Sequence, residues 1–149
     1  MRQIVYSMRF TGQAAAVGGS PNTLKATTTG SSISLTTKVD SAGVTSTTGP
    51  AEGGDAHFES EVRFSTDTGF QESGSIRFGD GGNRLRFSTV GEGYLADSPN
   101  PKLKHGAIIW RIDGGERQFA GATGLITSNF TVSDAGEVVD NHFGLIFLK

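Results

Sequence analysis

The chain has 149 residues, among them 22 glycines, four prolines and no cysteine, and its formal net charge is −2. This length allows one domain with a substantial core, and the glycine-rich composition is typical of a β protein with many tight turns. The absence of cysteine excludes disulfides, thiol nucleophiles and thiolate metal sites. The charge offers no basic surface for nucleic acid, and no apolar run approaches the roughly 18 residues of a membrane-spanning helix. No unbroken apolar stretch of about 7–15 residues marks a signal peptide near the N-terminus, so we expect a cytoplasmic protein that binds neither nucleic acid nor membrane.

Apolar and polar residues alternate along most of the chain, which is the pattern of strands that bury one face. No window of a dozen residues keeps the 3.6-residue period of a helix, so we expect little helix. The sequence predicts one all-β domain over residues 1–149. The expected strands cover residues 4–10, 24–28, 33–39, 58–64, 70–78, 85–87, 104–112, 118–132 and 138–148.

Short glycine-containing connections join several of these strands. Gly79–Asn83, Asp113–Gly115 and Asp134–Gly136 supply the residues with positive φ that hairpin turns need. Parallel crossovers need about a dozen residues or more, so the sheet should be antiparallel. With eight, or up to nine, strands we expect it to close into a barrel, which removes exposed edges.

Residues 40–55 interrupt the alternation, because this stretch is made of Ser, Thr, Gly and Pro with hardly any large apolar group. Such a segment buries too little surface to order itself firmly. We expect a flexible loop there; a lid over the mouth of the barrel is the alternative.

Two patterns that suggest cofactors have simpler explanations. Gly91–Ala96 matches the loose dinucleotide pattern G-x-G-x-x-A, but it lies within a β run rather than between a strand and a helix, so its glycines fit a bend or bulge better. His57, Glu59 and Glu61 share one strand face, which could begin a metal site, although Arg63 on the same face indicates a solvated exterior. We therefore predict neither a cofactor nor a metal.

Two ionisable residues stand on faces that are otherwise apolar. Glu72 lies between Phe70 and Ile76 in the alternation, and a carboxyl group in an apolar cavity has the raised pKa that a general acid needs. The alternative is that Glu72 lies at a strand end or bulge and reaches water or an arginine. His142 shares a face with Ile146, and a hydrogen-bonded structural histidine is the alternative to a catalytic one. Either residue could act as acid or base.

Further candidates could orient or surround a ligand. Tyr94 and Arg111 could donate hydrogen bonds to a carbonyl or carboxylate, which completes a predicted catalytic set of Glu72, His142, Tyr94 and Arg111. The predicted substrate-binding aromatic residues are Phe70, Trp110 and Phe119. For Trp110 and Phe119, packing in the core or at a subunit interface is the alternative.

The last predicted strand is apolar on both faces. Val138, Ile146 and Leu148 lie on one face, and Val139, Phe143, Leu145 and Phe147 lie on the other. A strand of this kind is covered on both sides. One face would line the barrel, and another subunit would cover the second.

The segment Gly114–Gly124, followed by Leu125–Val132, a turn and Val138–Leu148, resembles the G-x-G-x-F-x-G-A-x-G stretch and terminal hairpin of the allene oxide cyclase and dirigent-like barrels. The match departs at Glu116, where the second glycine is usual. It covers about 35 of the 149 residues, and no catalytic residue of that superfamily can be placed on this sequence.

This resemblance implies an eight-stranded antiparallel barrel with an apolar axial pocket, commonly assembled as a dimer or trimer. It further implies a cofactor-free cyclase or isomerase that holds a hydrophobic, polyketide-like or oxylipin-like molecule in one shape, a strategy of proximity and orientation. A non-catalytic barrel that carries or sequesters such a ligand is the alternative. A structural oligomer with a filled core is a third hypothesis.

Overall fold

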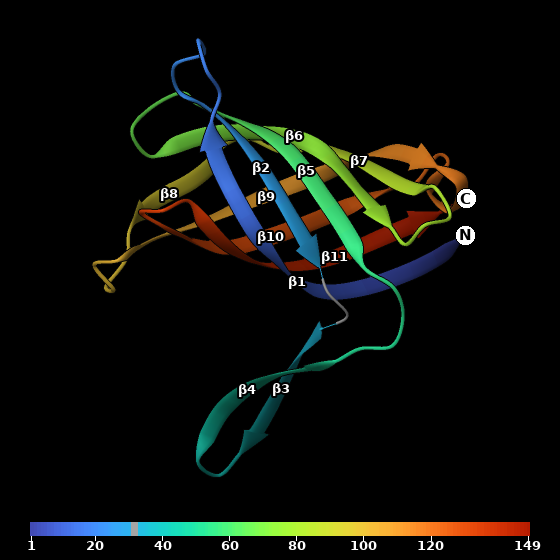
Figure 1. Ribbon diagram of the computed structural model, residues 1–149. Helices are drawn as coiled ribbons and strands as arrows, with labels where there is room; N and C mark the ends of the chain where they lie inside the picture. Colours follow the sequence, from blue (N-terminus) through green and yellow to red (C-terminus); the bar gives the residue numbers. More distant parts are fainter. Residues whose placement is uncertain (31–32) are drawn as a thin grey trace.

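A computed structural model describes residues 1–30 and 33–149 and confirms the predicted all-β fold. Eight antiparallel strands close into a barrel in the order β1-β2-β5-β6-β7-β9-β10-β11, and β11 pairs with β1 again (Figure 1). The only helical element of the described residues is the short 3₁₀ turn η1, Arg117–Phe119. The barrel strands are β1 Arg2–Ala16, β2 Thr23–Gly30, β5 Ala56–Phe64, β6 Gly69–Phe78, β7 Asn83–Thr89, β9 Leu103–Glu116, β10 Thr123–Ser133 and β11 Glu137–Leu148.

Nothing in the described part of the chain is a helix with the length and apolar character needed to cross a membrane.

An additional strand, β8 (Gly93–Asp97), follows β7 along the barrel wall. It pairs with β9 and, through two residues, with β6. Gly91, with φ +71°, lies at the break between β7 and β8, and a Cβ on Gly93 would lie only 2.4 Å from the ring of Phe70. These glycines therefore bend the wall and leave room for an aromatic ring. This agrees with the prediction that the glycines of Gly91–Ala96 form a bend or bulge.

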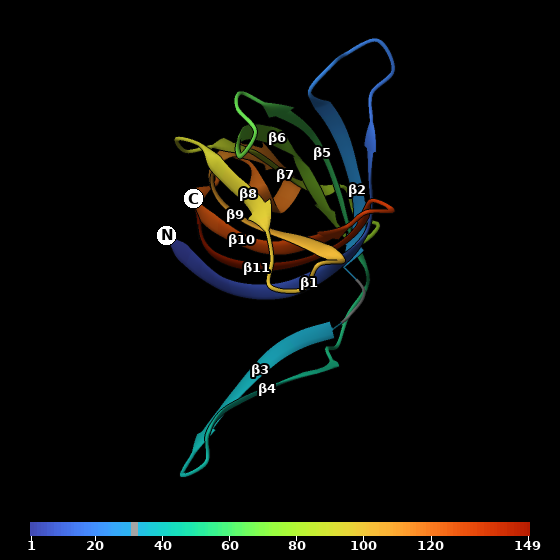
Figure 2. The ribbon, with the colours of Figure 1, turned by 90° about the vertical axis from the view of Figure 1, so that its left-hand side faces the viewer.

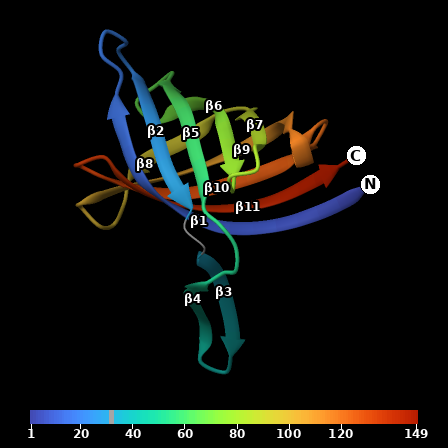
Figure 3. The ribbon, with the colours of Figure 1, turned by 45° about the vertical axis from the view of Figure 1, so that its right-hand side comes forward.

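Two strands lie outside the barrel, β3 (Ile33–Asp40) and β4 (Gly43–Pro50), which form a hairpin that projects from it (Figures 1 and 3). We expected a flexible loop over residues 40–55, but half of that segment is strand β4. The many threonines of the hairpin explain the difference, because β-branched residues favour extended backbone even where little is buried. The turn is closed by the Ala42 N–H, which donates to the Asp40 carboxylate at 2.9 Å, and by Gly43 with φ +116°.

Strand alternation divides the barrel into an apolar interior and a polar exterior, as the sequence predicts. The end of the barrel that holds both termini is covered by η1, since Phe119 is buried there and its ring packs 5.3 Å from that of Phe78 (Figure 1). Both rings border an open hollow that Ile4 and Tyr6 also line. The opposite end faces the viewer in Figure 2. Its inward apolar residues, among them Leu24 and Phe64, are only partly buried. We call this opposite end the mouth.

One part of the outer surface is apolar, and we call it the outer wall. Val5, Leu145 and Leu125 lie in one cross-strand row over β1, β11 and β10. Phe143 and Ile109 lie in the next row, separated by Thr127. All five apolar side chains are exposed, Val5 by 60% and Phe143 by 51%. The outward apolar face predicted for the last strand is therefore present and extends over its neighbours.

Candidate functional site

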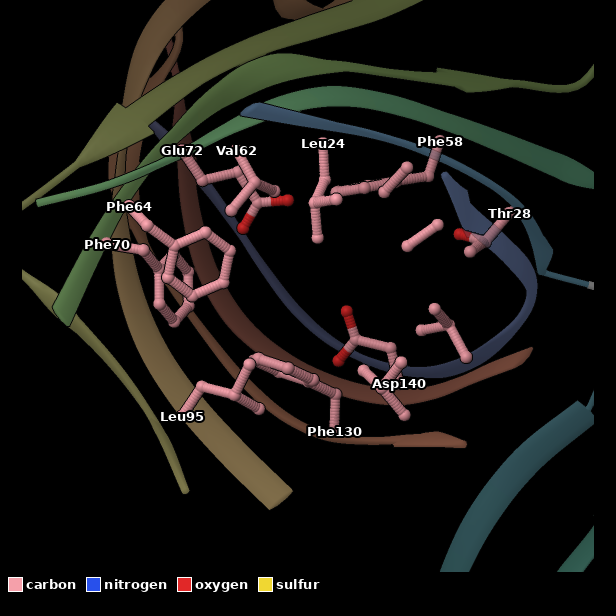
Figure 4. Close-up of a pocket in the computed structure, with 14 residues that line it drawn as sticks. Leu24, Thr28, Phe58, Val62, Phe64, Phe70, Glu72, Leu95, Phe130 and Asp140 are labelled. Carbon is pink, nitrogen blue, oxygen red and sulfur yellow. The ribbon is translucent and has the colours of Figure 1, made fainter. Parts of the chain in front are cut away.

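A cavity of about 50 Å³ lies inside the mouth of the barrel. Figure 4 shows its lining, in which Glu72 and Asp140 direct their carboxyl groups into the same space from opposite walls. Apart from Thr28, the other lining residues are apolar. They are Ala14, Leu24, Ala26, Phe58, Val62, Phe64, Phe70, Leu95, Phe130, Val132 and Val138. Pockets for drug-sized ligands usually measure about 300–1,000 Å³, so this cavity is too small for a whole ligand of that size and has room for one end of it.

Strand order explains why the two acids meet. Glu72 is on β6 and Asp140 is on β11, and these strands lie four positions apart in the eight-stranded ring. Inward-facing residues on strands so placed point at one another across the barrel. Both acids occupy inward positions of their strands, and each is less than a tenth exposed.

Asp140 is held by two donors within the β10–β11 wall. Ser128 Oγ donates to Oδ1 at 2.6 Å, and His142 Nε2 lies 2.8 Å from Oδ2. His142 Nδ1 in turn lies 2.7 Å from the hydroxyl of Tyr6. We assign the hydrogen bonds so that Nε2 donates to Asp140 and Nδ1 accepts from Tyr6, because this arrangement satisfies all three groups. Burial, followed by the charge of Asp140, raises the pKa of Tyr6, so the phenol keeps its proton.

Glu72 is held less completely in the β5–β6 wall. Ser60 Oγ donates to Oε1 at 2.5 Å. The indole N–H of Trp110 is close enough to lower the pKa of the Glu72 carboxyl, but it forms no hydrogen bond of acceptable geometry. Desolvation is the largest influence, and together with the charge of Asp140 it outweighs both donors and raises the pKa of Glu72 to about 8. Glu72 is therefore protonated at neutral pH.

Two buried polar atoms of the described residues have no hydrogen-bond partner, namely Thr28 Oγ1 and Trp110 Nε1. Thr28 lines the cavity, and Trp110 lies beside Glu72. Buried polar groups are nearly always paired in folded proteins, and exceptions tend to mark functional positions. Thr28 Oγ1 is thus a candidate for contact with a ligand, whereas Trp110 does not line the cavity.

The cavity combines a proton donor with a proton acceptor in an apolar setting. At neutral pH the Glu72 carboxyl can donate a proton, and the Asp140 carboxylate can accept one. Two carboxyl groups whose surroundings give them opposite protonation states are a recurrent arrangement in acid–base catalysis. The chemistry available here is the movement of a proton between two atoms of a bound molecule.

The structure places several predicted site residues in the interior. Glu72 and Phe70 line the cavity. His142 is 1% exposed and lies behind Asp140. Trp110 is fully buried between the aromatic core and Glu72. Phe119 is buried as well, but it lies at the opposite end of the barrel and does not line the cavity.

Tyr94 and Arg111 do not reach this cavity. Tyr94 is 56% exposed on β8, and the exposed Arg111 guanidinium binds Ser88 and Asp113 on the outer surface of the barrel. Strand parity explains the outcome for Arg111, since Trp110 points inward and its neighbour must therefore point outward. Together with Glu72 and His142 these residues do not form one site, in contrast to our expectation.

Sequence analysis missed the most important partner of Glu72. Asp140 shares the inward face of β11 with His142 and Val138, which is the same signal that singled out Glu72. Ser60 and Ser128 also lie on inward, apolar faces. A buried serine on the strand next to that of a buried acid could have been found only from the pairing of the strands.

Within residues 1–30 and 33–149, no group of three or more His, Asp or Glu side chains is arranged to hold a metal ion. The alternative metal set is on the outside, where Glu59 and Glu61 are exposed and Glu61 forms an ion pair with Arg63.

The comparisons with known proteins give no relative from which a function could be transferred, since no protein-family model, curated protein or solved structure matches the chain.

Proposed function

We propose that this protein is an isomerase or cyclase that needs no cofactor and acts on a small apolar molecule in the mouth cavity by moving a proton. The observation that carries the proposal is the pair of buried carboxyl groups, Glu72 and Asp140, directed into one apolar cavity with different hydrogen-bond environments. An eight-stranded barrel with an axial pocket is also the architecture that the resemblance to allene oxide cyclase and dirigent-like proteins implies.

In the proposed step Glu72 donates its proton to an oxygen or unsaturated carbon of the substrate, and Asp140 removes a proton from a neighbouring carbon. For a ketone, the C–H bond breaks, its electron pair forms the C=C bond of the enol, and the carbonyl oxygen receives the proton of Glu72. The protein then holds an ionised Glu72 and a protonated Asp140. Asp140 returns a proton to the α-carbon, or to the γ-carbon of a conjugated enol, while Glu72 takes back the O–H proton, and both residues are restored. His142 and Ser128 act as positioning residues that hold the Asp140 carboxylate.

A test with a small ketone requires no knowledge of the natural substrate. We would follow the exchange of the α-hydrogens of cyclopentanone for deuterium in D₂O by NMR. Wild-type protein should accelerate exchange over buffer, and Glu72→Gln and Asp140→Asn should each lower the acceleration about 100-fold, the usual contribution of one general acid or base. Glu59→Gln, on the outer face of β5, is the matched control and should leave the rate unchanged.

Full activity in Glu72→Gln would contradict the proposed role of this residue. Absence of any acceleration would favour the second candidate, a barrel that binds a small apolar ligand without reacting. The two hydrogen bonds that already occupy Asp140 favour this alternative, whereas the small volume of the cavity favours the third hypothesis, a structural oligomer with a filled core.

We also propose that the protein forms a homo-oligomer, either a dimer or a trimer, through the outer wall. An apolar face extending over four neighbouring strands is the kind of surface that marks protein interfaces. A second copy is the partner that such a face always meets at equal concentration, and a symmetric assembly of two or three copies would cover the outer wall of each copy. Size-exclusion chromatography with light-scattering detection, at micromolar protein concentration, gives the molar mass of the assembly and so the number of subunits.

A further inference from the structure

The distribution of charge differs sharply between the interior and the exterior of the barrel. Two acidic side chains, Glu72 and Asp140, are buried. None of the 13 lysine and arginine residues is buried, and the least exposed of them, Arg9, binds the side chain of Asn141. The histidine of the interior, His142, does not line the cavity and forms hydrogen bonds to Asp140 and Tyr6. The lining of the cavity therefore contains two carboxyl groups and no lysine or arginine.

Aromatic rings complete the surroundings of the two acids. Phe58, Phe64, Phe70 and Phe130 all line the cavity, and Figure 4 shows the rings of Phe64 and Phe70 beside the carboxyl group of Glu72. The faces of aromatic rings attract cations, and cages of such rings recognise ammonium groups. Carboxylates and aromatic rings both favour a positive ligand, whereas an anion would meet an uncompensated negative charge in an apolar setting.

We propose that the mouth cavity binds the head group of a small organic cation, with an ammonium nitrogen between Glu72 and Asp140 and its first carbon atoms against the phenylalanine rings. This inference goes beyond the proposed function: it names small apolar amines as a ligand class of the same cavity, and it rests on the carboxyl groups and aromatic rings that line that cavity. Carboxylates such as fatty acids are excluded by the same charge.

The dimensions of the cavity agree with a head group rather than a whole large ligand. A volume of about 50 Å³ holds a nitrogen and a few attached carbons. An apolar tail would leave through the mouth past Leu24, Leu95 and Val132, which line the cavity and are partly exposed. A short alkylammonium ion is therefore a suitable probe.

Cation binding has a consequence that a surface ion pair would not have. A positive charge beside Glu72 favours its ionised form, so amine binding should release a proton from the protein near neutral pH. The other titratable groups of the interior are Asp140, His142 and Tyr6, which form the hydrogen-bonded chain already described. Glu72 is the group with a proton to lose, since its pKa is raised to about 8.

The test is calorimetric titration of the full chain at pH 7 with n-butylammonium, 1-butanol and butyrate, each in two buffers of different ionisation enthalpy. Butylammonium should bind at least tenfold more tightly than butanol, butyrate should give no binding, and up to one proton should be released per amine. Equal or tighter binding of butyrate would overturn the inference, and so would amine binding no tighter than that of butanol.

Variants locate the binding event. Glu72→Gln should still bind butylammonium but release no proton, and Asp140→Asn should weaken binding at least tenfold. Asp97→Asn, at an exposed carboxylate on β8, should change neither. Proton release that persists in Glu72→Gln would contradict the inference, and weakening by Asp97→Asn would show surface binding and overturn it. If Asp140→Asn fails to fold, the Glu72→Gln result and the three-ligand comparison still decide.

Failure of this inference can be told apart from failure of the proposed function. If ketone exchange depends on Glu72 but butylammonium binds no more tightly than butanol, the cation site is rejected and the proton-transfer function stands. Amine binding with proton release, but without ketone exchange, would retain the cation site and reject the catalytic function.

Discussion

The β5–β6 hairpin and the β10–β11 hairpin form opposite walls of the barrel and carry the same arrangement of side chains. In the β5–β6 hairpin, Ser60 lies opposite Gly74 in the strand register, and Glu72 is two residues before that glycine. Ser60 donates a hydrogen bond to Glu72. Serine and acid thus lie diagonally across the hairpin, on its inward face.

In the β10–β11 hairpin, Ser128 lies opposite His142, and Asp140 is two residues before that histidine. Ser128 donates a hydrogen bond to Asp140. The one position that differs in kind is the residue opposite serine, which is Gly74 in one hairpin and His142 in the other. Histidine supplies a second donor to its acid, and glycine supplies none.

This single difference separates the states of two acids that share one cavity. A buried carboxylate needs hydrogen bonds to replace lost hydration, and two donors stabilise the charge of Asp140. Glu72 has one full hydrogen bond, so desolvation raises its pKa to about 8 and it keeps a proton. The comparison teaches that the same serine–acid arrangement can leave one acid with fewer donors, and at Glu72, where glycine lies opposite the serine, burial dominates and raises the pKa.

The largest expected effect is on the pH dependence of stability. The pKa of Glu72 rises from an unfolded value of 4.5 to about 8, so between these pH values the folded state binds more protons than the unfolded state. Stability from this group is therefore full below about pH 4.5 and is lost as pH rises to 8, by roughly 1.4 kcal/mol per unit and 4–5 kcal/mol in all.

Glu72→Gln removes this dependence and serves as the reference. We would measure the free energy of unfolding of wild type and variant in urea from pH 5 to 8. As the pH rises, the wild type should steadily lose stability relative to the variant. If the difference in the free energy of unfolding were constant across this range, Glu72 would be ionised in the folded protein. The proposed contrast between the acids of the two hairpins would then be wrong.

His142→Ala should make the β10–β11 wall resemble the β5–β6 wall. The change leaves the Asp140 carboxylate with one donor and the Tyr6 hydroxyl without a partner, at a cost of about 3 kcal/mol in the free energy of unfolding. The measurement is urea unfolding at pH 7. His105→Ala, at an exposed position of β9, is the control and should alter stability by no more than about 0.5 kcal/mol. A similar small change in both variants would show that the histidine does not support Asp140.

Ser60→Ala and Ser128→Ala compare the two serine donors directly. Loss of a hydrogen bond to a charged group costs about 1.5–3 kcal/mol and loss of one to a neutral group about 0.5–1.5 kcal/mol. Ser128→Ala should therefore be the more destabilising variant at pH 7. Ser60→Ala should also move the pH window of the Glu72 effect upward, because the hydrogen bond from Ser60 lowers the pKa of this carboxyl. If Ser60→Ala were the more destabilising variant, the hydrogen bond to Glu72 rather than the one to Asp140 would be the bond to a charged group.

The smallest effect on the fold is expected outside the barrel. Leu125→Glu places a charge in the outer wall, where the leucine is 51% exposed. The stability of the isolated barrel should change by no more than about 0.5 kcal/mol, while the proposed oligomer should dissociate, as seen by light scattering. Thr123→Glu, also outward on β10, is the control. An unchanged subunit number in Leu125→Glu would exclude the outer wall as the interface.

Much of the fold could be predicted because the signals are local. Alternation assigned Phe58, Ser60 and Val62 to one face of a strand, and the structure buries all three. The same rule identified Glu72 as an acid on an apolar face. The prediction from local composition was wrong at residues 43–50, where the lack of apolar residues suggested a loop although this threonine-containing stretch forms strand β4.

The site could be predicted only in part, because it depends on which faces point inward and which strands are opposite. Alternation groups Arg111 with Ile109 but does not state that this face is the outer one. Asp140 carried the same signal as Glu72, yet its importance comes from the chain of donors formed by Ser128, His142 and Tyr6. These residues come from three strands, and nothing local in the sequence joins them.

By itself, the sequence determined that this chain forms antiparallel strands, where most of them turn, and which side chains share a face, since period-two alternation and turn chemistry act between near neighbours. Closure of the barrel decided the remainder. It turned one face of every strand inward, brought β6 opposite β11, and so placed Glu72 and Asp140 in one cavity. Contacts of this kind depend on strand order and register, and for that reason only the tertiary structure could reveal them.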